Sequence, residues 1–165
     1  MKNQILIILQ ARSSSKRLPK KSLFLFKKIP LVVLCAKRLS NTGDKLIVAT
    51  SNHSSDNRLC ALLKENKIDY YRGSLKNVFS RFYNISKNLK KNDLIIRATA
   101  DNPFPDGKLV KILAKEIIRR KISYLGINHK VHKLPEGISL EIFKAKKLIE
   151  TNNKKLTKDE LEHVT

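Results

Sequence analysis

The chain has 165 residues and a formal net charge of +21 at pH 7, and 41% of its residues are apolar. This length suits a single domain over residues 1–165, and the apolar content excludes a disordered chain. The early apolar run at residues 5–9 is too short for a signal peptide or a membrane span, so we expect a cytoplasmic protein without membrane insertion. Cys35 and Cys60 fall in apolar helical patterns and are expected to be buried, reduced thiols.

Apolar and amphipathic segments alternate along most of the chain. In order, we predict a strand at 4–9, a helix at 29–39, a strand at 45–50, a helix at 55–67, a strand at 68–73, a helix at 74–89, a strand at 93–99, a helix at 106–121 and a strand at 122–126. After residue 127 we expect an irregular or hairpin segment, a strand at 138–143 and a helix that begins near Thr157.

The strands are apolar throughout, as is typical of strands that are covered on both faces. This pattern predicts a three-layer α/β/α fold with a mainly parallel, Rossmann-like sheet. Either Ser55 or Asp56 should cap the second helix, and Asp106 should cap the fourth. Thr157 and Glu160 have the spacing of a capping box.

Basic residues are spread over the whole chain, and two interpretations stay open. They can reflect a coding bias that places solvated lysines on polar faces. They can also serve an electrostatic role toward nucleic acid, an anionic membrane or a phosphorylated substrate. The sequence contains no tryptophan and no cluster of aromatic and basic residues on which bases stack.

The loops that follow the first four strands should meet at one edge of the sheet, where such folds bind ligands. The first of these loops, "QARSSSKRLPKKSL" at residues 10–23, places serines between cations. Cations and hydroxyls around one carboxylate suit a polyphosphate with its metal ion. The loops together offer Arg12, Ser13, Ser15, Arg17, Lys21, Ser51, Asn52, Arg72, Ser74, Arg97 and Asp101.

This first loop resembles the A-R-x-x-S-x-R-L-P-x-K loop of sugar cytidylyltransferases. The likeness is greatest to the branch of the spore-coat polysaccharide biosynthesis protein F, which is related to acylneuraminate and Kdo cytidylyltransferases. The motifs "VATSN", "YYRGSLKNVFSRFY", "IIRATADNPFPD", "LPEGISLEIF" and "DELEHVT" follow in the order of that family.

The resemblance implies a nucleotide-diphospho-sugar transferase fold and the transfer of CMP from CTP to a sugar, in particular a sugar acid, with release of pyrophosphate. Such a reaction would serve surface polysaccharide or glycoconjugate biosynthesis. It further implies that the partners are CTP and a sugar or sugar acid rather than nucleic acid, and that the protein can form a homodimer.

The resemblance also implies residue roles. Arg12, Lys21 and Asp101 would be catalytic, and Asp101 would bind Mg²⁺. The nucleotide would contact Ala11, Arg12, Ser13, Ser15, Arg17, Lys21, Ser51, Arg72 and Arg97. The sugar would contact Asn102, Glu141 and His163.

The chain departs from the family pattern in two ways. Ser14 and Lys20 stand where relatives often have glycine, and nothing like the family's later D-T-x-E-D segment follows "EHVT". We therefore expect a fold that lacks its C-terminal part. Two alternatives stay open: a nucleotide-binding remnant without turnover, and a basic nucleic-acid-binding protein whose affinity falls steeply with salt.

Overall fold

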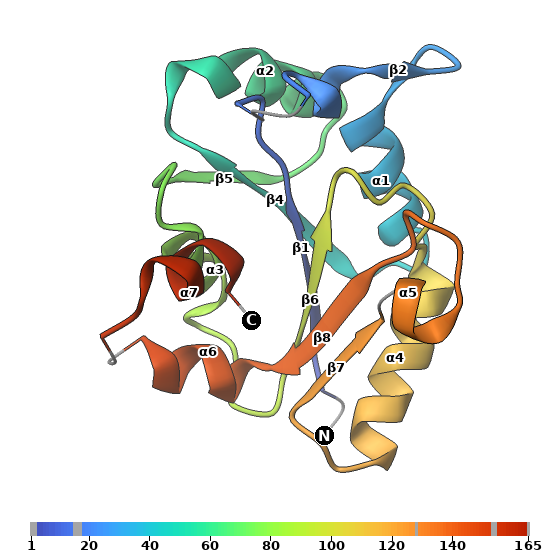
Figure 1. Cartoon of the computed structure of the whole chain (residues 1–165), viewed down its shortest axis with the longest axis vertical. Helices are drawn as coiled ribbons and strands as arrows, with labels where there is room; N and C mark the ends of the chain where they lie inside the picture. Colours follow the sequence, from blue (N-terminus) through green and yellow to red (C-terminus); the bar gives the residue numbers. More distant parts are fainter. Residues whose placement is uncertain (1–2, 15–17, 128, 153–154, 165) are drawn as a thin grey trace.

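The computed structural model describes residues 3–14, 18–127, 129–152 and 155–164. At its centre is a six-stranded sheet of order β5-β4-β1-β6-β8-β7 (Figure 1). The strands are β1 (Ile5–Gln10), β4 (Lys45–Ser51), β5 (Tyr70–Gly73), β6 (Leu94–Thr99), β7 (Tyr124–Ile127) and β8 (Leu140–Lys144). β5, β4, β1 and β6 pair in parallel, and β8 lies antiparallel to both β6 and β7. The predicted mainly parallel sheet is confirmed.

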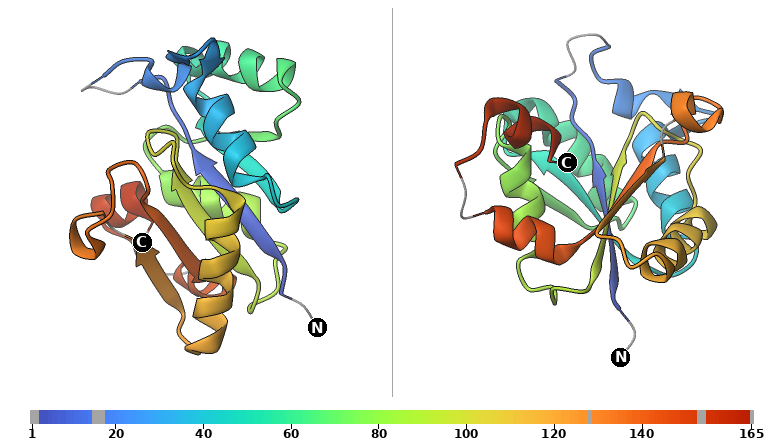
Figure 2. Two further views of the ribbon diagram at one scale, coloured as in Figure 1. Left: turned by 90° about the vertical axis from the view of Figure 1, so that its right-hand side faces the viewer. Right: turned by 60° about the horizontal axis from the view of Figure 1, so that its bottom comes forward.

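Helices cover both faces of the sheet, so the three-layer prediction is also confirmed (Figure 2). One face carries α1 (Leu31–Leu39), α2 (Asn57–Glu65) and α4 (Gly107–Arg119), and the other carries α3 (Val78–Ser86), α6 (Ala145–Thr151) and α7 (Lys158–His163). Alternate side chains of β1 explain the two cores, because Ile7 and Leu9 pack under the first set of helices. Leu6 and Ile8 pack under the second set.

Several local predictions are confirmed. Asp106 caps α4 by accepting a bond of 3.0 Å from the N–H of Leu109. Thr157 and Glu160 form the capping box that begins α7. Cys35 and Cys60 are buried free thiols, and burial raises the pKa of Cys35 to about 12.

The segment before α1 differs from its prediction. Residues 29 and 30 were expected to start a helix, but β2 (Leu25–Phe26) and β3 (Ile29–Pro30) instead form a small antiparallel ribbon. Its turn is made by Lys27 and Lys28, with φ angles of 45° and 67°. Such a turn usually contains Asn-Gly, and the Lys-Lys pair carries no comparable turn signal. The short helices η1 (Lys21–Leu23), η2 (Ser54–Asp56) and α5 (His129–His132) were also not predicted, and neither was α6.

No helix within the described ranges combines the length and the apolar character needed to cross a bilayer.

The end of α2 places a lysine where glycine is favoured. The N–H of Lys67 donates to the carbonyl of Lys64 at 3.0 Å, and the N–H of Ile68 donates to the carbonyl of Leu63 at 2.9 Å. These two bonds define a Schellman motif, and Lys67 has the left-handed φ of 55° that the motif requires.

We expect Lys67→Gly to raise the free energy of unfolding by about 0.5–1 kcal/mol, because it relieves the left-handed strain at a smaller entropic cost. Urea denaturation would measure the change. Lys64→Gly is the matched control inside the same helix, and it should lower stability by about 1 kcal/mol. A loss of stability in both variants would contradict the prediction.

Candidate functional site: a cation-lined cavity at the end of β1 and β6

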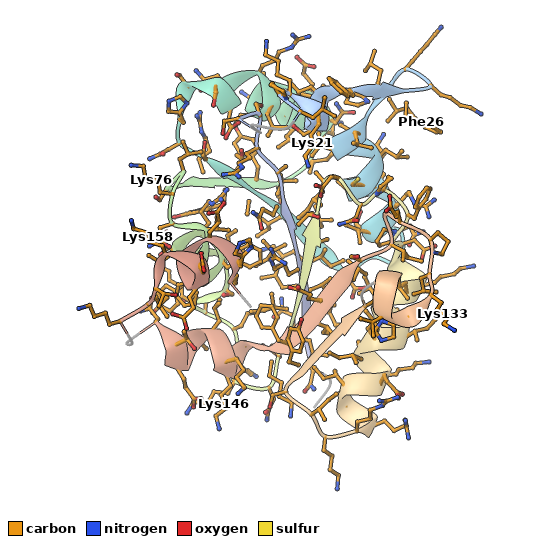
Figure 3. The ribbon with its side chains drawn as sticks, viewed as in Figure 1. Lys21, Phe26, Lys76, Lys133, Lys146 and Lys158 are labelled. Atoms are coloured by element: carbon orange, nitrogen blue, oxygen red, sulfur yellow. The ribbon has the colours of Figure 1, made fainter. Side chains whose placement is uncertain are left out.

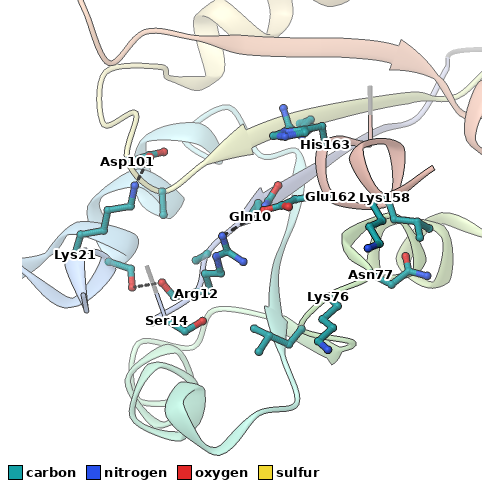
Figure 4. A pocket seen from close by; sticks show the side chains of 16 residues that line it. Gln10, Arg12, Ser14, Lys21, Lys76, Asn77, Asp101, Lys158, Glu162 and His163 are labelled. Atoms are coloured by element: carbon teal, nitrogen blue, oxygen red, sulfur yellow. Dashed lines mark hydrogen bonds and ion pairs between the residues drawn. The ribbon is translucent and has the colours of Figure 1, made fainter. Parts of the chain in front are cut away.

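A cavity of about 1080 Å³ opens at the carboxyl ends of β1 and β6 (Figure 4). The chain runs outward from β1 through β4 to β5 and then returns to β6 on the other side of β1. A crevice at this reversal of strand order is where parallel α/β sheets bind ligands. Of the residues that the sequence predicted for the site, the cavity is lined by Ala11, Arg12, Lys21, Arg97, Asp101 and His163.

The cavity also contains cations that the sequence analysis did not select. Lys76 lies just before α3, and Lys158 belongs to α7. Together with Arg12 and Lys21 they outnumber the carboxylates of Asp101 and Glu162. A concave surface with excess positive charge attracts a polyanion such as a polyphosphate.

Lys21 and Asp101 form the central ion pair of the cavity. The ammonium of Lys21, in η1, donates to Oδ2 of Asp101, which follows β6 and lies 80 residues away in sequence. Burial alone would raise the pKa of Asp101, but hydrogen bonds from Lys21 and Thr99 outweigh it and lower that pKa. Asp101 is therefore an anion at neutral pH and is held beside a cation.

Arg12 connects the loop after β1 to α7. Its Nη2 lies 3.6 Å from Oε1 of Glu162, and both side chains are partly exposed at the cavity wall. Lys158, Leu161 and His163 line the same wall, so α7 closes one side of the cavity. Of the residues on this helix, only His163 is predicted from the sequence to belong to the site.

A buried carboxylate supports the loop after β1 from behind. Asp56 is 0% exposed. Its Oδ1 accepts the N–H of Ser13 at 2.7 Å. Its Oδ2 accepts the N–H of Ser51 at 3.1 Å, the hydroxyl of Thr50 at 3.1 Å and the hydroxyl of Ser51. This one side chain therefore ties the end of β1 to the end of β4.

The structure corrects the prediction that the side chain of Asp56 could cap α2. Asp56 does occupy the N-cap position of α2, but within the described chain its side chain makes no capping bond. Burial alone would raise its pKa, whereas the hydrogen bonds from Ser51, Ser13 and Thr50 lower it. The carboxylate is thus ionised and fully engaged in holding the two loops.

Arg81 of α3 places a second buried charge near this carboxylate. Its side chain is 0% exposed, and its Nη1 lies 3.3 Å from the carbonyl of Ala49. Burial and, less strongly, Arg12 lower its pKa to about 10, while Asp56 opposes the shift. The guanidinium therefore stays protonated at neutral pH and balances the charge of Asp56.

Other predicted residues lie outside this cavity. Ser51 is buried against Asp56. Arg72 donates to the carbonyls of Ser51 and His53, each at 3.0 Å, and to Oδ1 of Asn57 at 2.9 Å. Within the part of the chain that the structure describes, both residues therefore support the loop after β4. Ser13 is buried at the base of the cavity loop, and its backbone binds Asp56. The predicted Ser15 and Arg17 lie outside the described residues.

Lys20 and Ser14 stand at the two positions where the resembling sequences often have glycine, and their geometry shows why glycine suits each position. Lys20 has a φ of 59°, the left-handed conformation that glycine adopts without strain. Ser14 is exposed at the cavity lining, where a small residue leaves room for a ligand.

A second cavity of about 270 Å³ adjoins the first at Arg97, which lines both. Arg97 of β6 and Glu141 of β8 are paired in register, and Nη1 lies 2.8 Å from Oε2. The predicted Asn102 and Glu141 line this second cavity together with Thr99 and Tyr124. Burial and the neighbouring charge of Glu141 raise the pKa of Tyr124, so its hydroxyl stays protonated.

A family model described as "Cytidylyltransferase" matches residues 6–164. This chain belongs to the cytidylyltransferase family. The spore coat polysaccharide biosynthesis protein SpsF of Bacillus subtilis is 32% identical over 170 residues, with 99% of this chain and 69% of SpsF covered. An uncharacterised protein of Methanocaldococcus jannaschii is 31% identical over 164 residues. The match covers 98% of this cytidylyltransferase chain but only 65% of that relative.

Solved structures agree with this membership. A cytidylyltransferase from Leptospira borgpetersenii superposes with a TM-score of 0.87 at 25% identity, over 99% of this chain and 69% of that one. The CMP:2-keto-3-deoxy-manno-octonic acid synthetase, solved in complex with CTP, gives a TM-score of 0.68 at 13% identity, over 97% and 82% of the two chains. The second likeness shows that the two proteins share a fold.

We expect Asp56→Asn to lower the free energy of unfolding at pH 7 by about 2–4 kcal/mol, because an amide nitrogen would then face buried donors. Urea denaturation is the measurement, with the exposed Asp69→Asn as a control that should change stability by less than about 0.5 kcal/mol.

The difference in the free energy of unfolding between wild type and Asp56→Asn should depend on pH. The folded-state pKa of Asp56 is lowered, so its stabilisation is present above the unfolded value of about 3.9 and is lost as pH falls through the lower folded value. The gap between wild type and Asp56→Asn should therefore narrow below about pH 4. A gap that is constant with pH would show that the ionised carboxylate is not what stabilises the loop.

Proposed function

We propose that this chain binds CTP and takes part in the transfer of CMP to a sugar hydroxyl, with release of pyrophosphate. The observation that carries the proposal is the cation-lined cavity at the ends of β1 and β6, in a chain of the cytidylyltransferase family. Two similar proteins support the substrate class: SpsF is a polysaccharide biosynthesis protein, and the CMP:2-keto-3-deoxy-manno-octonic acid synthetase was solved in complex with CTP.

In this proposal the triphosphate lies along the loop after β1. Arg12 and Lys21 would bind its β and γ phosphates, and Lys76 and Lys158, which also line the cavity, would add positive charge. The nucleoside would then extend toward Leu75 and Asn77, which offer an apolar surface and an amide group. Neutralising and aligning the triphosphate is the main requirement for attack at its α phosphorus.

The residues present fit a Mg²⁺ ion that is shared with the substrate. The structure's described residues contain no cluster of three or more acidic, histidine or cysteine side chains suited to a metal. Mg²⁺ is, however, often held by one or two carboxylates together with substrate phosphates, and Asp101 supplies such a carboxylate in the cavity. When bound, the ion would neutralise phosphate charge and polarise the α phosphate.

The chemistry assigned to the side chains is binding and charge stabilisation. The sugar hydroxyl would lose its proton to water and form a bond to the α phosphorus, while the bond from that phosphorus to the bridging oxygen breaks and pyrophosphate leaves with the electron pair. Lys21, released from Asp101, and Arg12 would stabilise the charge that develops on the leaving pyrophosphate. The sugar or sugar acid would occupy the second cavity, where Asn102 and Glu141 can bind its hydroxyl groups.

We expect CTP with Mg²⁺ to raise the melting temperature by about 5 °C or more when the nucleotide is in large excess over its dissociation constant. UTP, ATP and GTP should give smaller shifts. Asp101→Asn should remove the magnesium-dependent part of the CTP shift, and Asp69→Asn should keep it. A shift that is equal for all nucleotides, unaffected by Asp101→Asn and abolished by salt would contradict the proposal.

Glu141→Gln should separate the sugar step from nucleotide binding. The CTP-induced thermal shift should not decrease, because Glu141 lines only the second of the two cavities described and its replacement leaves the cation of Arg97 in the first. Turnover with an accepted sugar, followed by pyrophosphate release, should fall about tenfold to a hundredfold through loss of a charged hydrogen-bond partner. Glu116→Gln in α4, which lines neither cavity, is the control, and equal turnover in both variants would place the sugar elsewhere.

A further inference from the structure

The β2–β3 ribbon carries apolar side chains into solvent. Figure 3 places Phe26 at the outer edge of the molecule and Lys21 nearer its centre. Phe24, Leu25 and Phe26 are 49%, 69% and 59% exposed, and Ile29 is 40% exposed. We call these four residues the ribbon patch. Successive side chains of a strand point to opposite faces, so the ribbon is apolar on both faces.

The ribbon patch is surrounded by positive charge. Lys20, Lys27 and Lys28 are exposed beside it, and the first acidic residue of the whole chain is Asp44. Lys27 and Lys28 occupy the two left-handed turn positions, where Asn-Gly would be relaxed. Strained positions of this kind persist where the surrounding structure or a function retains them.

The lysines of the ribbon and its two apolar faces limit which partner can cover it. A second copy of the chain would bring the same lysines face to face across a twofold axis, and like charges would repel. A flat protein surface would cover only one of the two apolar faces. The interface of an anionic bilayer offers phosphates for the lysines and an apolar boundary that surrounds an inserted side chain.

We propose that the β2–β3 ribbon docks this protein onto anionic lipid surfaces. Phe24, Leu25 and Phe26 enter the headgroup region, and the ammonium groups of Lys27 and Lys28 contact lipid phosphates. The contact is peripheral and leaves the main cavity open, since none of the ribbon-patch residues lines that cavity. It does not depend on the proposed catalytic activity.

The absence of tryptophan from the chain provides a specific probe. Phe26→Trp places the only tryptophan of that variant in the ribbon patch, and Ile112→Trp places one at a 61% exposed position of α4. Vesicles of phosphatidylcholine with phosphatidylglycerol should shift the emission of Phe26→Trp to shorter wavelength. Vesicles of phosphatidylcholine alone should not shift it, and neither lipid should shift Ile112→Trp.

Vesicle co-sedimentation separates the two contributions to binding. The double variants Leu25→Ser/Phe26→Ser and Lys27→Gln/Lys28→Gln should each weaken binding to the anionic vesicles about tenfold or more. Lys146→Gln/Lys147→Gln, on exposed positions of α6, changes the net charge equally and should weaken binding far less. Thermal unfolding checks that all three double variants remain folded.

Three results would overturn the proposal. The wild-type protein could fail to bind anionic vesicles. The α6 variant could lose as much binding as the ribbon variants, which would assign binding to diffuse charge. Sedimentation could also reveal a dimer in solution that Leu25→Ser/Phe26→Ser abolishes, which would assign the ribbon patch to a second copy of the chain.

Discussion

The course of the loop after β1 depends on the bond from the N–H of Ser13 to the carboxylate of Asp56, 43 residues further along the chain. The same carboxylate binds Ser51 and Thr50 at the end of β4. A buried anion with several donors is stable only while all of them stay in place. This requirement fixes the base of the loop, and from that base Arg12 extends toward the cavity.

The reversal of strand order provides the space that this loop borders. β1 ends beside β6, so residues far apart in sequence face one another, as Lys21 and Asp101 do. On the opposite side, α7 packs on the core beside α3 and meets Arg12 through Glu162. The cavity therefore takes its charged groups from four separate parts of the chain: the loop after β1, the segment before α3, the end of β6 and α7.

Arg97 divides the site into two regions of different chemistry. The larger cavity is rich in cations, whereas the smaller one is lined by hydroxyl, amide and carboxylate groups around the pair of Arg97 and Glu141. The charge of Arg97 is largely balanced by Glu141 on the neighbouring strand. This arrangement suits a polyanion on one side and a hydroxyl-rich group on the other.

The sequence by itself determined the fold class, the order of most elements, two helix caps and the membership of the family. These follow from local periodicity, from side chains that bind their own neighbouring backbone, and from motifs kept in order. Only the tertiary structure decided which polar residues face the cavity. Ser51 and Arg72 lie in the predicted loops yet bond to backbone or buried groups. Lys76, just before α3, and Lys158, in α7, reach the cavity from segments that lie far apart in the chain. The sequence around Asp56 predicts a local helix cap. In the folded protein its buried carboxylate instead accepts hydrogen bonds from four donors at the ends of β1 and β4, and these bonds replace the capping bond.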